Sequence, residues 1–488
     1  MVATAMPLAN SSSDSHWQRV TRSFLIDAAL LPVSFKIAAT LRFEDLISDQ
    51  EMGYLPAILI GALALPSLLY ISGFYVSTKL RRDRSKEALQ ILGVLAATTL
   101  IVMAMGSLVH SARVGRGVLG MGMAITAALV LIRHLAGSRH FRYQKTAFVV
   151  SNRRDEQLAQ TFNKTLDRGN SLMGVFTTPG YKTTTDIPRL GCTKDIETLA
   201  ETLGLECVLC DERLVDAPML GTKLRRLRFQ GVNVTTLGQA FEEQYQIVPL
   251  ELVTDRWLLN ASSQPQLFYI RKLKRAFDLV VASILLLLLA PSFALIAVLI
   301  KLTSPGPVIY RQMRCGKFGR SFQVFKFRSM RVDAEKDGRA RWWSLNDPRE
   351  TLLGRWMRKF RIDEIPQLIN ILRGDMSFVG PRPERPEFVK ELSDQVPFFQ
   401  ERMMVLPGLT GWAQVNYPYG SNAEDAARKM EFDLYYMKHM SVVLDVFILL
   451  DTIRTVIRGG ATQRETGRTA LQGLSVPAAH RVPMADAA

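Results

Sequence analysis

The chain has 488 residues, 48% of them hydrophobic, and a formal net charge of +16. This length allows two or three separate cores, so we expect a multi-domain protein. Such a charge is typical of proteins that bind nucleic acid, an anionic membrane face or phosphate-bearing substrates. No basic region has the pattern of a helix-turn-helix, a zinc finger or an RNA-recognition module, so nucleic acid is not an expected partner.

The four cysteines do not predict a metal or redox site. They are Cys192, Cys207, Cys210 and Cys315. Cys207 and Cys210 form a CxxC motif within ECVLC, which is typical of a buried strand, and strand alternation would direct the two thiols to opposite faces. No second CxxC and no histidine pair completes a zinc site, so we expect core cysteines in a reducing cytoplasm.

Four apolar runs predict a transmembrane region at residues 21–145, after a disordered amino terminus at 1–20. Each run is roughly long enough to cross a bilayer, which takes about 20 helical residues. The runs are 24–41, 54–76, 88–110 and 117–135. The first is the weakest, because Asp27 and Lys36 would be costly at the bilayer midplane unless paired. We expect a four-helix transmembrane bundle.

The loops between these runs predict their orientation. Residues 42–51 are mostly acidic, whereas residues 79–86 and 133–145 are strongly basic. Basic loops remain on the cytoplasmic side of a membrane. We therefore expect both the amino terminus and everything after residue 135 in the cytoplasm.

Residues 146–255 predict a small α/β domain. Short apolar stretches alternate with polar helical stretches, which favours a largely parallel, Rossmann-like sheet. The expected strands are 146–150, 171–177, 205–210 and 231–237. The turn after the first strand, residues 151–157, has no glycine, although a dinucleotide-binding turn needs glycine for close approach of a pyrophosphate. A structural or regulatory role is therefore favoured over dinucleotide binding, with some other ligand as a further alternative.

A fifth apolar run, Phe277–Ile300, contains Pro291 near its centre. Proline removes a backbone donor and kinks or breaks a helix. Basic clusters stand on both sides of the run, so both ends favour the cytoplasm. A helix at 276–300 that enters the membrane, breaks at Pro291 and returns satisfies both flanks. A fully spanning helix is the alternative.

An acidic pair, Asp363 and Glu364, precedes Ile365-Pro366 at an expected helix start. Taken alone, the pair would be an acidic N-cap that complements the helix dipole. The surrounding cations change this interpretation, because a carboxylate among them stays ionised and suits a nucleophile, while the cations themselves suit a pyrophosphate. They are Arg355, Arg358, Lys359, Arg361 and Arg382.

Arg382 lies in the motif Pro381-Arg382-Pro383. The two prolines restrict the backbone on both sides, which lowers the entropy cost of directing one guanidinium at a phosphate. A single such motif is a weak signal, and an exposed surface arginine is the default interpretation.

Residues from about 271 to 460 resemble the bacterial sugar transferase family, the polyprenyl-phosphate hexose-1-phosphate transferases. The matching stretches are KRAFDLVVASILLLLLAPSFALIA, KFRSM, LRGDMSFVGPRPERPEF, LPGLTGWAQVN and FDLYYMKHMSVVLDV. The amino-terminal half resembles the extension of large members, and VNYPYGSNAEDAARKMEFDLYY resembles the subgroup linked to exopolysaccharide and exosortase clusters. One departure is Ala290 before Pro291, where many members have serine.

This resemblance implies transfer of a sugar-1-phosphate from a UDP-sugar to undecaprenyl phosphate at the cytoplasmic face of the bacterial inner membrane, which initiates exopolysaccharide assembly. It implies that Asp363 attacks the β-phosphorus and forms a phosphosugar-aspartyl intermediate. Glu364 would orient the nucleophile or assist a proton transfer, and Mg²⁺ would bridge Asp363 and the pyrophosphate. A homodimer is compatible with the large members, and a non-catalytic membrane scaffold or sugar-nucleotide sensor is the alternative function.

The resemblance also implies substrate-binding residues. Arg358 and Arg382 match phosphate-facing arginines of the family, and three further residues fall in family motifs: Lys326, Arg328 and Asp433. All these residues lie between 326 and 433, so we expect a mainly α catalytic domain at 271–460 that is active alone, followed by a disordered tail at 461–488.

Overall fold

The computed structural model describes residues 16–43, 49–75, 84–108, 114–136, 144–165, 170–184, 186–262, 267–334, 347–417 and 422–458. The chain separates into two compact units, residues 1–141 and 142–488. The predicted tail at 461–488 and most of the predicted disordered amino terminus lie outside the described residues. The prediction was wrong for residues 16–20, which form the first turns of a helix.

Four long helices make up the first unit: α1 (His16–Phe43), α2 (Asp49–Ser72), α3 (Arg84–Leu108) and α4 (Arg116–Ala136). Helix α1 packs against α2 and α4, and α3 packs against the same two helices. Each contains a stretch long and apolar enough to cross a membrane, as does a fifth helix in the second unit. The chain is a membrane protein.

Asp27, whose charge made the first run the weakest prediction, is paired inside this unit. Its carboxylate accepts a hydrogen bond from the Tyr75 hydroxyl and lies 3.2 Å from His134 Nε2, and it forms an ion pair with Arg133. Pairing removes most of the cost of placing a charge among apolar helices. The network therefore joins α1 to the end of α4.

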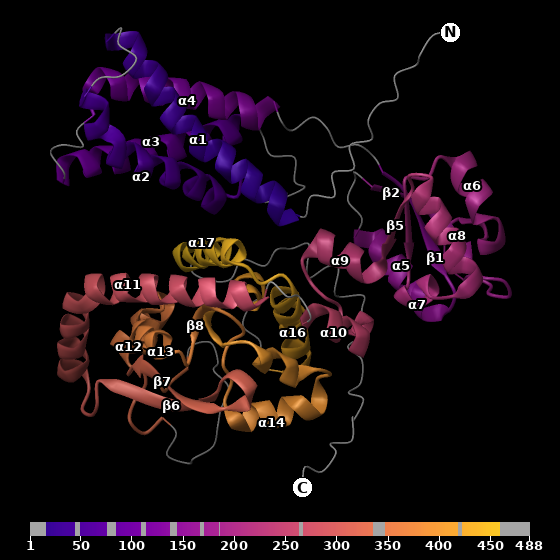
Figure 1. Ribbon diagram of the computed structural model, residues 1–488. Helices are drawn as coiled ribbons and strands as arrows, with labels where there is room; N and C mark the ends of the chain where they lie inside the picture. The colour runs from indigo at the N-terminus through magenta and orange to yellow at the C-terminus, as the bar shows by residue number, and fades with distance from the viewer. Residues whose placement is uncertain are drawn as a thin grey trace. The chain divides into compact units, whose positions relative to one another are not determined.

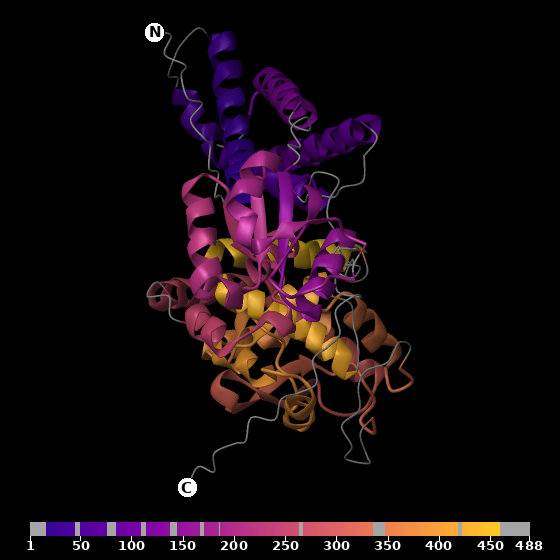
Figure 2. The ribbon, with the colours of Figure 1, turned by 90° about the vertical axis from the view of Figure 1, so that its right-hand side faces the viewer.

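A five-stranded parallel sheet opens the second unit, with strand order β3-β2-β1-β4-β5. Its strands are β1 (Gln144–Val150), β2 (Asn170–Thr177), β3 (Arg189–Cys192), β4 (Cys207–Cys210) and β5 (Asn233–Thr236). The helices are α5 (Arg153–Thr165), α6 (Ile196–Leu203), α7 (Glu212–Val215), α8 (Pro218–Phe229) and α9 (Leu237–Tyr245), and they flank the sheet (Figure 2). Strand β3 was not predicted, because its four residues are only partly buried and show no apolar alternation.

Both faces of this sheet are apolar, because successive side chains along a strand point alternately towards the helices on one face and the helices on the other. Ala147 and Val149 join a core with α6 and α8, whereas Phe148 between them meets Phe162 of α5. Cys207 and Cys210 are buried free thiols, and burial raises the pKa of each to about 12. Such thiols stay protonated, which agrees with the prediction that they are core residues.

The carboxy-terminal part contains helices around two small sheets (Figure 1). Its helices are α11 (Leu267–Thr303), α12 (Leu352–Lys359), α13 (Leu368–Arg373), α14 (Pro386–Gln395), α15 (Trp412–Asn416), α16 (Ala423–Lys438) and α17 (Val442–Arg458). Its strands are β6 (Ile309–Cys315) with β7 (Ser321–Phe327), and β8 (Ser377–Val379) with β9 (Gly408–Thr410). Three short 3-10 helices are η5 (Lys317–Gly319), η6 (Ile362–Gln367) and η7 (Phe399–Met404).

The stretch of α11 before Pro291 is held by hydrogen bonds to α13 and β8. Arg275 donates to the carbonyls of Ile371 and Leu372 at the end of α13, the latter at 2.8 Å. Asp278 accepts a hydrogen bond of 3.2 Å from the backbone N–H of Phe378 in β8. Lysine and arginine at a helix end complement the exposed carbonyls there.

The stretch of α11 after Pro291 packs against β7 and α12. Ile300 packs with Phe327 and Met357, and Phe293 joins that cluster. Just beyond the helix, the Ser304 carbonyl accepts a hydrogen bond of 2.7 Å from Arg328. Figure 1 shows the α11 ribbon turning partway along its length, so both of its ends meet one compact body.

The segment after α9 packs against the carboxy-terminal part. Trp412, which is fully buried, donates from Nε1 to the Gln246 carbonyl at 2.9 Å. The N–H of Val248 donates to the backbone carbonyl of Glu431 at 3.1 Å, and the N–H of Leu250 donates to the Glu431 carboxylate at 3.2 Å. These contacts attach the segment to α15 and α16.

Glu242 of α9 extends this contact. Its carboxylate lies 2.8 Å from Lys438 Nζ and 3.1 Å from His439 Nε2, and it accepts a hydrogen bond of 3.1 Å from Trp257 of α10 (Asp255–Ser262). The α/β part predicted at 146–255 is therefore joined to the segment predicted as the catalytic domain at 271–460 by buried polar contacts as well as by the chain.

Candidate active site

The acidic pair lies inside a 3-10 turn, not at the start of an α-helix as predicted. Helix η6 begins after Arg361, whose backbone is left-handed with φ of 56°, and it includes both Asp363 and Glu364. The following helix α13 ends at Gly374, where φ is 92° and glycine avoids the strain of a side chain. Ile362 and Ile365 pack into the cluster around the last turns of α11. This apolar packing fixes the orientation of η6 and therefore the position of the acidic pair that it carries.

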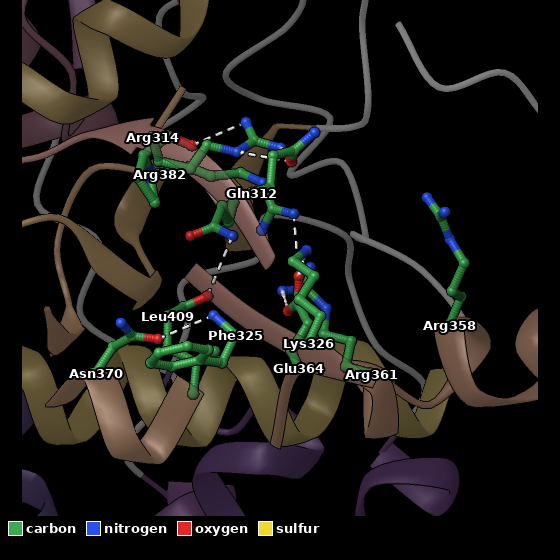
Figure 3. A network of polar contacts seen from close by, with 12 residues as sticks. Gln312, Arg314, Phe325, Lys326, Arg358, Arg361, Glu364, Asn370, Arg382 and Leu409 are labelled. Atoms are coloured by element: carbon green, nitrogen blue, oxygen red, sulfur yellow. Dashed lines mark hydrogen bonds and ion pairs between the residues drawn. The ribbon is translucent and has the colours of Figure 1, made fainter. Parts of the chain in front are cut away.

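Three cations surround Glu364, as Figure 3 shows. Lys326 Nζ and Arg382 Nη2 lie 3.1 Å and 3.0 Å from Oε1, and Arg361 Nη1 lies 3.8 Å from Oε2. Burial raises the pKa of this carboxyl, but Lys326, Arg382 and Arg361 outweigh burial and hold the pKa well below its usual range. Glu364 is therefore ionised and fixed in place.

Asp363 is in a different environment from its neighbour. It is 6% exposed, and among the described residues no hydrogen bond or ion pair holds its carboxylate. Burial raises its pKa and Glu364 raises it further, while Lys326 opposes them. We expected the cations to keep the nucleophile ionised. The structure instead gives their direct contacts to Glu364, and the pKa of Asp363 is raised by burial in spite of them. The oxygens of Asp363 are not engaged by any described residue.

Two of the predicted arginines are not part of this cluster. Arg358 lies 3.2 Å from Glu350 and is set apart from Glu364 in Figure 3. Arg328 is almost fully buried and donates to the carbonyl and hydroxyl of Ser304, at 2.7 and 2.8 Å. Arg328 therefore holds the end of α11 close to β7.

Asp433 also lies away from the cluster. It is 1% exposed in α16 and forms an ion pair of 2.9 Å with Arg402 of η7. Arg402 in turn donates to the backbone carbonyl of Arg382 at 3.2 Å. Asp433 is thus connected to the site through another arginine.

The residues present are compatible with the magnesium ion expected from the sequence. The described residues hold no cluster of three or more metal-binding side chains. Magnesium in phosphate chemistry is usually bound by one or two carboxylates and by oxygens of the substrate and water. The Asp363 carboxylate, with oxygens that none of the described residues engages, suits that mode.

Comparison with known proteins places this site in a family. The model for bacterial sugar transferases matches residues 269–459, which include the acidic pair and the cations around it. A UDP-glucose:undecaprenyl-phosphate glucose-1-phosphate transferase of Xanthomonas campestris is 30% identical over 383 residues, which are 74% of this chain and 77% of that protein. The chain belongs to the bacterial sugar transferase family.

Two further relatives match a smaller share of the chain. A UDP-N-acetylgalactosamine-undecaprenyl-phosphate N-acetylgalactosaminephosphotransferase of Aeromonas hydrophila is 46% identical over 38% of this chain, so the chain spans less than half of that relative, 44% of its length. An exopolysaccharide production protein of Rhizobium leguminosarum is 39% identical over 38% of this chain and 96% of its own length.

Two arginines near the site are not among the site residues predicted from the sequence. Arg361 was noted only as one of several cations, yet its left-handed backbone starts the turn that carries the acidic pair. Arg402 gives no signal in the sequence, because its partners Asp433 and Arg382 are distant from it along the chain. Only the fold brings these residues together.

Proposed function

We propose that this protein transfers a sugar-1-phosphate from a UDP-sugar to undecaprenyl phosphate. The observation that carries the proposal is the contrast within the acidic pair. Glu364 is held by three cations, whereas none of the described residues holds the carboxylate of Asp363 beside it by a hydrogen bond or ion pair. The Xanthomonas and Aeromonas relatives carry names of this reaction with different sugars, glucose and N-acetylgalactosamine, so the sugar is a separate question.

In the proposed reaction Asp363 is the nucleophile. One of its oxygens forms a bond to the phosphorus that bears the sugar, the bond from that phosphorus to the bridging oxygen breaks, and uridine monophosphate leaves. An oxygen of undecaprenyl phosphate then attacks the same phosphorus and releases Asp363, so two easier displacements replace one difficult step. Glu364 orients the turn and holds Lys326 and Arg382 where the two phosphates enter.

The cations around Glu364 supply the electrostatic stabilisation. Phosphoryl transfer depends mostly on positioning and on neutralising the negative charge of the phosphate oxygens. Lys326 and Arg382 can share their donors between Glu364 and a phosphate, and Arg358 would join them by leaving Glu350. A magnesium ion held by Asp363 and the pyrophosphate would add positive charge at the reacting phosphorus.

We also propose that α11 enters and leaves the membrane on one side. A straight helix over residues 277–300 would separate its ends by about 35 Å. Both ends instead contact the same body, through Asp278 before Pro291 and through Ile300 after it. This arrangement favours the re-entrant alternative over the spanning one, because the site stays at the height of the acceptor phosphate.

Helix α12 would lie in the same membrane interface. Leu352, Trp356 and Phe360 are 87%, 58% and 38% exposed and recur every four residues, on one face. Arg355 and Lys359 lie close to them. Aromatic and aliphatic side chains with basic neighbours are typical of helices that rest in the headgroup region.

The first unit would be a four-helix transmembrane bundle in the bacterial inner membrane, with the catalytic part in the cytoplasm. The basic loops predicted from the sequence support this orientation. The parallel sheet would form a Rossmann-like domain. The Rhizobium relative, matched over 96% of its length, supports placing the chemistry within residues 269–459.

The test is release of uridine monophosphate by purified protein given undecaprenyl phosphate, Mg²⁺ and a panel of UDP-sugars. At least one UDP-sugar should give release, and Asp363→Asn should lower it by several orders of magnitude without changing membrane insertion. Asp394→Asn is a matched control, because Asp394 is exposed in α14 (Pro386–Gln395), outside the cluster. A folded wild-type protein that releases nothing from the whole panel would favour the scaffold or sensor alternative.

A further inference from the structure

The backbone that carries Arg382 is held from both sides. Before it, the Gly380 N–H donates to the Thr410 carbonyl and the Gly408 N–H donates to the Pro381 carbonyl, both at 2.9 Å. These bonds extend the pairing of β8 with β9. These hydrogen bonds therefore fix the backbone immediately before Arg382.

Three donors then bind three successive carbonyls from Arg382 onward. Arg402 Nη2 donates to the Arg382 carbonyl at 3.2 Å, and Arg314 Nη1 donates to the Pro383 carbonyl at 3.1 Å. The N–H of Cys315 donates to the Glu384 carbonyl at 2.9 Å. The donors come from β6 and η7, so the loop is fixed by elements that are distant in sequence; Figure 3 shows Arg314 beside Arg382.

Arg402 is itself immobilised. Its guanidinium forms the ion pair of 2.9 Å with Asp433 and lies over the ring of Phe399 at 4.9 Å. Both partners of the ion pair are buried, with side chains 9% and 2% exposed. A buried ion pair is weak support for stability, because removing two charges from water offsets much of their attraction.

The pKa of Asp433 shows this cost. Burial raises it to about 6 although Arg402 lowers it. The geometry points to a role besides stability, because Arg402 places one donor on the backbone carbonyl of Arg382.

We propose that Arg402, held by Asp433, is a positioning residue that sets the direction of the Arg382 guanidinium. Asp433 then influences phosphoryl transfer through Arg402 and does not touch the substrate. This inference rests on the proposed function, in which Arg382 neutralises a phosphate. A displacement of about 1 Å in a catalytic group can cost about 100-fold in rate.

The test is a double-mutant cycle on uridine monophosphate release. Arg402→Gln and Asp433→Asn should each lower kcat by about 10-fold to 100-fold, and Arg402→Lys, which keeps the charge, should lose less. If Arg402 acts through Arg382, the double variant Arg382→Gln with Arg402→Gln should be no slower than Arg382→Gln alone. Additive losses would show an independent role and overturn the inference. Arg320→Gln, at an exposed arginine beyond β6, is the matched control and should retain full activity.

A second readout does not need activity. Amide hydrogen exchange of Gly408 and Cys315, whose N–H groups donate to the carbonyls of Pro381 and Glu384, should be faster in Arg402→Lys and Asp433→Asn than in the wild type and Arg320→Gln, and unchanged exchange at both would contradict the inference. A wild-type protein that is inactive with every UDP-sugar would refute the proposed function alone. An active wild type whose Arg402 and Asp433 variants match it in rate would refute the positioning role alone.

Discussion

Removing the segment between α9 and α11 should destabilise the catalytic part. Two shortened chains separate the possibilities, one covering residues 246–460 and the other covering 271–460. The longer one keeps the donors and acceptors that meet Trp412 and Glu431, and the shorter one lacks them. From the sequence alone we expected the shorter chain to be sufficient.

The size of the effect follows from the contacts. Three hydrogen bonds are lost, each with a net contribution of about 1 kcal/mol. Val248 and Leu250 are 1% and 3% exposed, and burial of such a side chain contributes about 1.5–3 kcal/mol. Together these amount to about 6–9 kcal/mol, comparable with the whole stability of a domain, which is about 5–15 kcal/mol. The shorter chain should be largely unfolded or inactive at growth temperature.

The assay is thermal unfolding in lipid nanodiscs, followed by tryptophan fluorescence, together with uridine monophosphate release. Trp412 is a reporter of its own, because it is fully buried when its Nε1 meets Gln246. The chain from 246 should unfold well above the chain from 271 and should be the more active of the two. Equal unfolding temperatures and equal turnover would show that the segment contributes nothing to the catalytic part.

Three further predictions concern charge, topology and the phosphate site. Burial raises the pKa of Glu431 to about 7, so the native state holds this proton more tightly than the unfolded chain, and the contribution of Glu431 to stability is lost as the pH rises from 4.5 towards 7. Glu431→Gln should remove this contribution, a total on the order of 3 kcal/mol over that range, so stability should fall less with pH than in the wild type. Cysteines placed singly at positions 272 and 317, in a background without the native four, should both resist a membrane-impermeant thiol reagent in intact cells; labelling of 317 alone would show a spanning α11. Arg382→Lys should lower kcat by about 100-fold or more, because lysine cannot provide a fork of donors, and unchanged kinetics would make Arg382 structural.

Most of the architecture was predictable because it depends on local patterns. The four apolar runs became α1 to α4, and the alternation in 146–255 became a parallel sheet. Strand β3 was missed because an edge strand of four partly buried residues has no periodic signal. The helix expected to begin at the acidic pair was predicted from the capping preference of Asp363, but Arg361 adopts a left-handed backbone and a 3-10 turn forms first.

The sequence predicts which residues form the site, but not which of them contact one another. Asp363, Glu364, Lys326 and Arg382 were selected from motifs, and the structure brings the last three into direct contact. The sequence could not show that the cations would hold Glu364 in preference to Asp363, because that depends on which carboxylate η6 turns towards β7. Pairings between distant segments, such as Arg402 with Asp433, are likewise set by the fold.

The central claim is that Asp363 becomes covalently attached to a sugar phosphate. The most direct measurement is intact-protein mass spectrometry after incubation with the active UDP-sugar and Mg²⁺ but without undecaprenyl phosphate. The account predicts a mass increase of one sugar phosphate, located on Asp363 by peptide mapping, absent in Asp363→Asn and lost when undecaprenyl phosphate is added. Turnover that leaves the protein mass unchanged under all conditions, or an adduct that persists in Asp363→Asn, would contradict it.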